Sequence, residues 1–170
     1  MFRWIDLGAW ALFFCLAILF AGLASYSALQ QFDAIPFWDM FDGYLNFYSD
    51  FSNGDWSALW NQHNEHRIVL SKLLFVFDLA VLNGTTPFLI WINLALVGLI
   101  AIQFIAFMRS ISGGKEINWI PWFIITVMFS RIQGENLDSA FQSQFFLVNL
   151  LPLSALFYAA KSVNGQCRTK

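Results

Sequence analysis

The strongest constraint on the fold is a run of about 23 residues, 7–29, that contains no charged side chain. In an α-helix such a run is long enough to cross about 30 Å of hydrocarbon. A signal peptide is the alternative, because Arg3 precedes the run and small residues follow near its end. However, the apolar core of a signal peptide is shorter, at roughly 7–15 residues. We therefore predict an uncleaved first transmembrane helix.

The composition is that of a membrane protein rather than a soluble domain. Hydrophobic residues make up 58% of the 170 residues and charged residues only 12%, whereas a soluble domain carries about 25% charged residues. Twenty phenylalanines and eight tryptophans suit a surface that faces lipid, with aromatic rings at the level of the headgroups. The formal net charge of −2, without a basic stripe, points to no nucleic-acid partner. We predict an all-α polytopic membrane protein whose surroundings are a lipid bilayer.

Three further segments predict transmembrane helices, at 86–108, 117–131 and 142–161. Four spans place the segments 30–85 and 132–141 on one side of the membrane and the tail, 162–170, on the other. If the N-terminus is inside, six of the nine basic residues lie in the cytoplasm, as the positive-inside rule requires: Arg3, Arg109, Lys115, Lys161, Arg168 and Lys170. Both termini are therefore predicted to be cytoplasmic and both loops external.

The segment 68–82 is apolar but carries Lys72 and Asp78 within about 15 residues. A charge near the bilayer centre costs about 2.5–3.5 kcal/mol on insertion scales. We predict an amphipathic helix that lies in the membrane interface with its apolar face down. The alternative is a short buried span with both charges facing a bundle interior. A chain of five spans with an external N-terminus would also satisfy the charge rule, and would place the first loop in the cytoplasm.

The first loop begins with an acidic and aromatic stretch that predicts a surface helix at about 37–51. Its aromatic and aliphatic residues recur at helical spacing: Trp38, Phe41, Leu45 and Tyr48. Asp39 and Asp42 are three residues apart and would share one face of this helix. Two such carboxylates can bind a divalent cation or supply a general base. The alternative is an ordinary solvated helix face.

A second polar group follows in the same loop, where His63, Glu65, His66 and Arg67 lie within five positions. The spacing of the two histidines would suit zinc, although a complete ligand set is not visible. Arg67 suits bidentate recognition of a phosphate. The second loop adds two carboxylates, Glu135 and Asp138. Because four spans bring both loops to one side, we expect the two acidic groups to form a common site.

Two stretches, WNQHNEHRIVLSKLLF and ENLDSAFQSQFFL, resemble uncharacterised bacterial membrane proteins of the GT-C glycosyltransferase type. The order of first span, early Asp pair and surface helices is also similar to the start of those enzymes. The resemblance implies a bacterial inner-membrane enzyme that takes a sugar from a polyprenyl-phosphate carrier at the outer face. It would make Asp39 or Asp42 the catalytic base or metal ligand, and would give a substrate-binding role to the remaining polar residues: His63, Glu65, His66, Arg67, Glu135 and Asp138.

The resemblance covers only the front of that family, whose members usually have more spans and often a soluble C-terminal domain. The chain is therefore expected to be such a glycosyltransferase or its N-terminal module, with a divalent cation as a candidate cofactor. The alternative is a non-catalytic membrane subunit, or a truncated homologue, that acts as the partner of a larger membrane protein. A small transporter or channel ranks last, because the four predicted spans carry no charge in their interiors.

Overall fold

The computed structural model describes residues 2–32, 35–85, 87–112 and 118–167. Every regular element in these ranges is a helix, and the extended pairing within them is an isolated bridge between His63 and His66. Among the described residues, three helices are long and apolar enough to cross a membrane: α1 (Phe2–Gln30), α4 (Phe88–Ile111) and α7 (Ser143–Cys167). The predicted all-α fold is confirmed for these ranges, with three candidate spans where the sequence predicted four.

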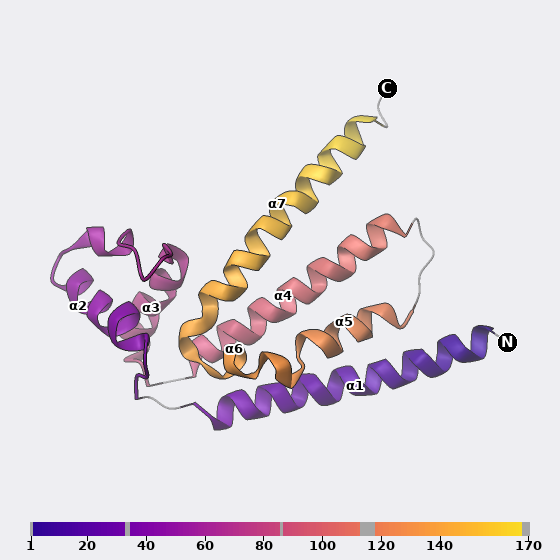
Figure 1. The fold of residues 1–170 in the computed structure, drawn as a ribbon, viewed down its shortest axis with the longest axis horizontal. Coiled ribbons are helices and arrows are strands. Elements are labelled where there is room, and N and C mark those ends of the chain that lie inside the picture. The colour runs from indigo at the N-terminus through magenta and orange to yellow at the C-terminus, as the bar shows by residue number, and fades with distance from the viewer. Residues whose placement is uncertain (1, 33–34, 86, 113–117, 168–170) are drawn as a thin grey trace.

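The long helices spread from a common end, where the shorter helices of the first loop gather (Figure 1). Those shorter elements are the π-helix η1 (Phe41–Asn46), α2 (Phe47–Ser52), the 3₁₀-helix η2 (Trp56–Leu59) and α3 (Val69–Leu82). We call residues 41–82 the cap. Both ends of the chain lie at the opposite end of the long helices (Figure 1).

The predicted span 117–131 is not confirmed as a transmembrane helix; residue 117 itself lies outside the described residues. The segment forms α5 (Ile120–Met128), a helix of nine residues, which is about 14 Å long at 1.5 Å per residue. Pro121 occupies its first turn, and Ser130 just beyond it is extended. Apolar composition predicted a span, but turn residues at both ends shorten the helix.

Although α5 is short, the residues that follow α4 in the sequence and precede α7 bring the chain back to the cap end of the long helices (Figure 1). The α5 rings pack against the first half of α1, where Phe13 stacks on Trp119 and Phe14 meets the edge of Trp122. The next segments are η3 (Arg131–Gln133), α6 (Gly134–Asp138) and η4 (Ala140–Gln142). Arg131 donates a hydrogen bond to Ser27 near the last turn of α1. The second loop therefore meets the end of α1 from which the first loop departs.

The core has two parts, one between the long helices and one inside the cap. In the first, Ala24 and Ala28 of α1 are buried together with Val97 of α4 and Phe146 of α7. Small residues such as alanine allow membrane helices to approach closely. The second part joins cap residues to Leu89 of α4 and Phe141 of η4, which are also buried. These two residues attach the cap to the long helices.

Helix α3 has its charged side turned into the protein. Lys72 and Asp78 are only 3% and 2% exposed, and Phe75 between them is fully buried. At 14 residues, α3 is about 21 Å long and is not among the candidate spans. The sequence predicted an amphipathic helix with its polar face away from lipid. In the structure that polar face is covered by η1 and η2, so its charges do not reach water.

The two buried charges of α3 have different partners. The Lys72 Nζ donates to the carbonyl oxygens of Ala58 at 2.7 Å and Asn61 at 2.6 Å, and lies 5.0 Å from the ring centroid of Phe47. Asp78 Oδ2 accepts a hydrogen bond from the Tyr44 hydroxyl, whereas its Oδ1 atom is buried without a partner. Burial lowers the pKa of Lys72 and raises the pKa of Asp78, which the Tyr44 hydrogen bond partly offsets.

We expect Asp78→Asn to stabilise the cap at pH 8. A carboxyl whose folded pKa is raised contributes stability at low pH, and this stability is lost as the pH rises through the folded pKa. Asparagine keeps an oxygen that can accept the Tyr44 hydrogen bond and carries no charge to desolvate, while its Nδ2 replaces an Oδ1 atom that already lacks a partner. The thermal midpoint of the detergent-solubilised variant should therefore exceed that of the wild type at pH 8, with a smaller difference at pH 5. A lower midpoint at pH 8 would contradict this assignment.

Candidate functional site

A tight hairpin in the first loop carries both histidines. The backbone N–H of His63 donates to the His66 carbonyl at 2.8 Å, and the N–H of His66 donates to the His63 carbonyl at 3.0 Å. Asn64 in the turn has a φ of 51°, a left-handed conformation that asparagine tolerates better than most residues. The hairpin gives each histidine a different environment, whereas their spacing in the sequence suits a shared zinc ion.

His63 contributes to the point at which the two loops meet. Its ring packs edge-on against Phe141 of η4, with 5.2 Å between centroids, and Phe141 stacks on Phe75 of α3 at 5.3 Å. Gly43 of η1 lies directly against both rings: a Cβ atom there would be 2.5 Å from Phe141 Cζ and 2.9 Å from His63 Cε1. We call Gly43, His63, Phe75 and Phe141 the loop junction.

The predicted catalytic carboxylates lie beside the loop junction. Asp42 immediately precedes Gly43 and is exposed, and its Oδ1 accepts a hydrogen bond from Asn46 at 2.9 Å. Asp39 is also exposed and lies in the turn before η1, where its backbone carbonyl accepts from the Gly43 N–H at 2.8 Å. The predicted helix at 37–51 therefore begins later than expected. A π-helical turn such as η1 often marks a functional segment.

The two carboxylates of the second loop differ in their surroundings. Asp138 is 14% exposed, and its Oδ2 accepts from Gln31 Nε2 at 2.9 Å and lies 3.8 Å from Arg131. Burial raises the pKa of Asp138, while Arg131 and Gln31 act in the opposite direction. Asp138 thus ties the second loop to the end of α1. Glu135 is exposed, which makes it the more accessible of the two carboxylates.

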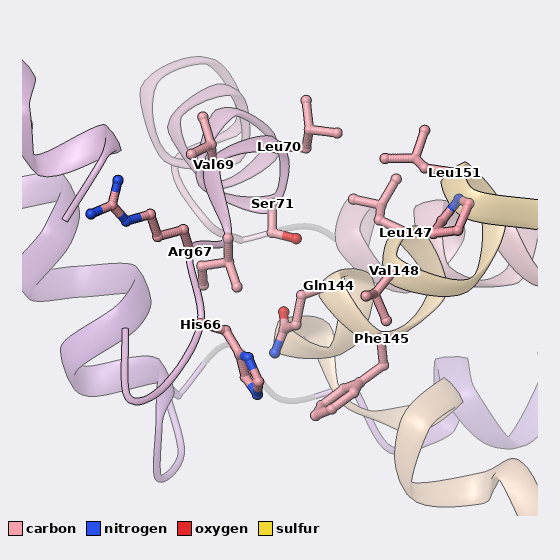
Figure 2. Close-up of a pocket in the computed structure, with 12 residues that line it drawn as sticks. His66, Arg67, Val69, Leu70, Ser71, Gln144, Phe145, Leu147, Val148 and Leu151 are labelled. Atoms are coloured by element: carbon pink, nitrogen blue, oxygen red, sulfur yellow. The ribbon is translucent and has the colours of Figure 1, made fainter. Parts of the chain in front are cut away.

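A groove of about 420 Å³ lies between α3 and α7; we call it the α3–α7 groove. One wall is aliphatic, with Leu70, Leu147, Val148 and Leu151. The end away from the leucines carries the polar side chains of His66 and Gln144, and Ser71 and Arg67 also line the groove (Figure 2). Figure 2 shows the His66 ring beside the Gln144 amide, whereas the guanidinium of Arg67 turns away toward the cap helices. The groove is therefore amphipathic along its length.

Two polar side chains of the groove were not predicted from the sequence. The Ser71 hydroxyl accepts a hydrogen bond from Ser143 at 2.9 Å, which joins α3 to α7. Gln144 has a buried Oε1 atom without a hydrogen-bond partner. The signal available in the sequence for Gln144 and for Phe141 was that both belong to the stretch ENLDSAFQSQFFL.

The remaining predicted site residues lie close to the groove but do not form a metal cluster. Glu65 is exposed in the hairpin turn, and Arg67 is exposed where the hairpin leads into α3. Within the described ranges, no three or more His, Cys, Asp or Glu side chains are grouped so as to hold a metal ion. The hairpin thus directs His63 to the loop junction and His66 to the groove.

Comparisons with known proteins gave no relative for this chain. No protein-family model matches it, and neither the curated proteins nor the solved structures searched contain a similar one.

Proposed function

We propose that the chain is a GT-C-like glycosyltransferase, or the N-terminal module of one, that takes a sugar from a polyprenyl-phosphate carrier. The observation that carries this proposal is the amphipathic α3–α7 groove, whose polar end is joined to the loop junction by the 63–66 hairpin. The substrate of such an enzyme has the same division, with an apolar chain and a charged phosphate. The proposal also draws on the resemblance of the two sequence stretches.

In this proposal the carrier chain lies along the aliphatic wall of the groove and its phosphate lies at the polar end. The wall residues Leu147, Val148 and Leu151 belong to α7, a candidate span, so the chain of the carrier would enter from the bilayer. His66 and Gln144 can donate to phosphate oxygens. Arg67 is exposed, and rotation of its side chain would add a bidentate, charge-assisted contact.

Asp39 and Asp42 are the candidates for catalysis beside the loop junction. One carboxylate would take the proton of an acceptor hydroxyl as its oxygen attacks the anomeric carbon of the donor sugar. The bond from that carbon to the phosphate oxygen breaks, and polyprenyl phosphate leaves with the bonding electron pair. Alternatively, the same carboxylates would bind a divalent cation. Glu135 would contribute to substrate binding from the second loop.

The proposed orientation in a bacterial inner membrane places the cap on the outer side and both termini on the cytoplasmic side. In support, the two ends of the chain lie at the end of the long helices opposite the cap (Figure 1). Arg109 in the last turn of α4 and Lys161 near the end of α7 are also remote from the N-terminal ends of these helices, where the cap lies. Basic residues at the cytoplasmic ends follow the positive-inside rule.

A second candidate function is that of a non-catalytic subunit bound to a larger membrane protein. It is favoured because the protein itself covers only a small part of the surface of two candidate spans. Only 11% of the apolar window is buried in α1 and in α7, against 44% in α4. The free surfaces of α1 and α7 can face lipid or further transmembrane helices. This alternative predicts co-purification of a larger membrane protein and tolerance of single carboxylate substitutions.

Asp39→Asn and Asp42→Asn test the proposed catalysis, with Asp50→Asn in α2 as the matched control. The measurement is release of polyprenyl phosphate from a radiolabelled polyprenyl-phosphate sugar in membranes that contain the full chain. A general base contributes about 10²–10⁴-fold, so one of the first two variants should lose transfer by about 100-fold at equal protein level. Asp50→Asn should retain transfer. Unchanged release in both Asp39→Asn and Asp42→Asn would remove the proposed base.

A further inference from the structure

One face of α3 is apolar and exposed along its whole length. Leu70, Leu73, Phe77 and Val81 are 47%, 49%, 46% and 59% exposed. Their spacing of three, four and four residues places them in one stripe, because residues three or four apart share a helix face. We call these four residues the α3 stripe. Such a stripe normally packs against something apolar.

The charges of α3 are kept away from this stripe. Lys72 and Asp78 are the charged residues of the helix, and both are buried in the cap against the Ala58 and Asn61 carbonyls and the Tyr44 hydroxyl. The hydrogen bonds of Lys72 also attach η2, and the residues just after it, to α3. Trp56 in η2 and Trp60 just after it are 69% and 63% exposed. Tryptophan is enriched at the boundary between membrane and water.

The α3 stripe is continuous with a surface that belongs in the membrane. Leu70, its first residue, lines the α3–α7 groove together with Leu147, Val148 and Leu151 of α7. Val148 and Leu151 are 64% and 48% exposed on a helix that is a candidate span. A bilayer around α7 at this level would therefore extend to the stripe. This continuity favours lipid as the occupant over a separate protein.

We propose that the α3 stripe is inserted into the lipid of the leaflet on the cap side and holds the cap on the membrane surface. The contact is apolar, with α3 at the boundary of headgroups and acyl chains, as in other interfacial helices. Because the α3 charges are sealed inside the cap, insertion does not depend on anionic lipid. The inference is independent of the proposed sugar transfer.

Site-directed fluorescence on the full chain tests this inference. Cys15 and Cys167 are replaced by serine, and one cysteine is introduced as Leu73→Cys or Val81→Cys, both at exposed positions. Each variant is labelled with an environment-sensitive fluorophore and reconstituted in phosphatidylcholine vesicles, with or without phosphatidylglycerol. We expect strong quenching by spin-labelled lipids and weak quenching by iodide, with the same result in both vesicle types. Asp50→Cys in α2 is the control and should be quenched by iodide.

Two results would overturn the inference. Quenching of the Leu73→Cys and Val81→Cys labels by iodide, as strongly as at position 50, would place the stripe in water. Protection of both labels from iodide and from the lipid quencher would mean that protein covers the stripe. Helical content measured by circular dichroism verifies that each labelled variant is folded. Loss of transfer in the Asp39→Asn or Asp42→Asn variants would not change these readouts.

Discussion

Replacing Lys72 with methionine should destabilise the cap by about 2–4 kcal/mol, because each carbonyl left without a donor costs about 1–3 kcal/mol. The Lys72 Nζ is the donor to the Ala58 and Asn61 carbonyls, and methionine fills similar space without a hydrogen. The expected loss of stability is smaller than the combined free energy of two charged hydrogen bonds. Methionine carries no charge, so it avoids the desolvation cost that lowers the Lys72 pKa. Hydrogen exchange of the amides in residues 55–61 should accelerate strongly.

Lys161→Met near the end of α7 provides the control for this measurement, because Lys161 is exposed. It removes the same charge and should leave exchange in residues 55–61 unchanged. Faster exchange confined to η2 and its flanks would identify local opening of the cap rather than global unfolding. Unchanged exchange in Lys72→Met would show that the η2 segment is held on α3 by the surrounding apolar contacts alone.

The long helices could be predicted from the sequence because length and apolar composition are sufficient for a span. The run 7–29 lies within α1, and 86–108 overlaps α4, whose described helix runs from Phe88 to Ile111. The segment 117–131 has the same composition, but Pro121 and the extended Ser130 limit α5 to nine residues. Hydropathy alone does not distinguish a short helix packed on a neighbour from one that spans.

The orientation of α3 was only half predictable. The spacing of polar and apolar residues along the helix defines a polar and an apolar face. It does not indicate which of the two faces the rest of the protein covers. The partners of Lys72 are backbone carbonyls of Ala58 and Asn61, and a carbonyl has no signature in the amino-acid sequence. The sequence therefore left burial of both charges as the alternative for this segment, and the structure buries them inside the cap, under η1 and η2.

The candidate site was predicted as a set of polar residues but not as an arrangement. The interval of three between His63 and His66 suggested that both bind one zinc ion, whereas the 63–66 hairpin gives them different neighbours. Asp138 was grouped with Glu135, yet it bonds to Gln31 at the end of α1. Contacts between residues so distant in the chain depend on tertiary packing, which local patterns do not encode.

Gly43→Ala should disrupt the loop junction, with a loss of stability of about 3 kcal/mol, at the upper end of the usual cost of overpacking a core. The added Cβ would lie 2.5 Å and 2.7 Å from two ring atoms of Phe141 and 2.9 Å from His63 Cε1. Phe141 cannot simply retreat, because its other face stacks on Phe75. The second loop must then shift away from η1, and amide exchange in residues 139–143 should accelerate.

Gly98→Ala in α4 is the matched control for Gly43→Ala, since nothing lies within 4 Å of the Cβ position there. Alanine in a helix interior is favoured over glycine by roughly 0.5–1 kcal/mol, so this variant should be at least as stable as the wild type. The thermal midpoints of both variants in detergent make the comparison. Equal midpoints would mean that the loop junction accommodates the added methyl group without cost. A selective loss in Gly43→Ala would instead show that close packing of η1 against Phe141 and His63 stabilises the protein.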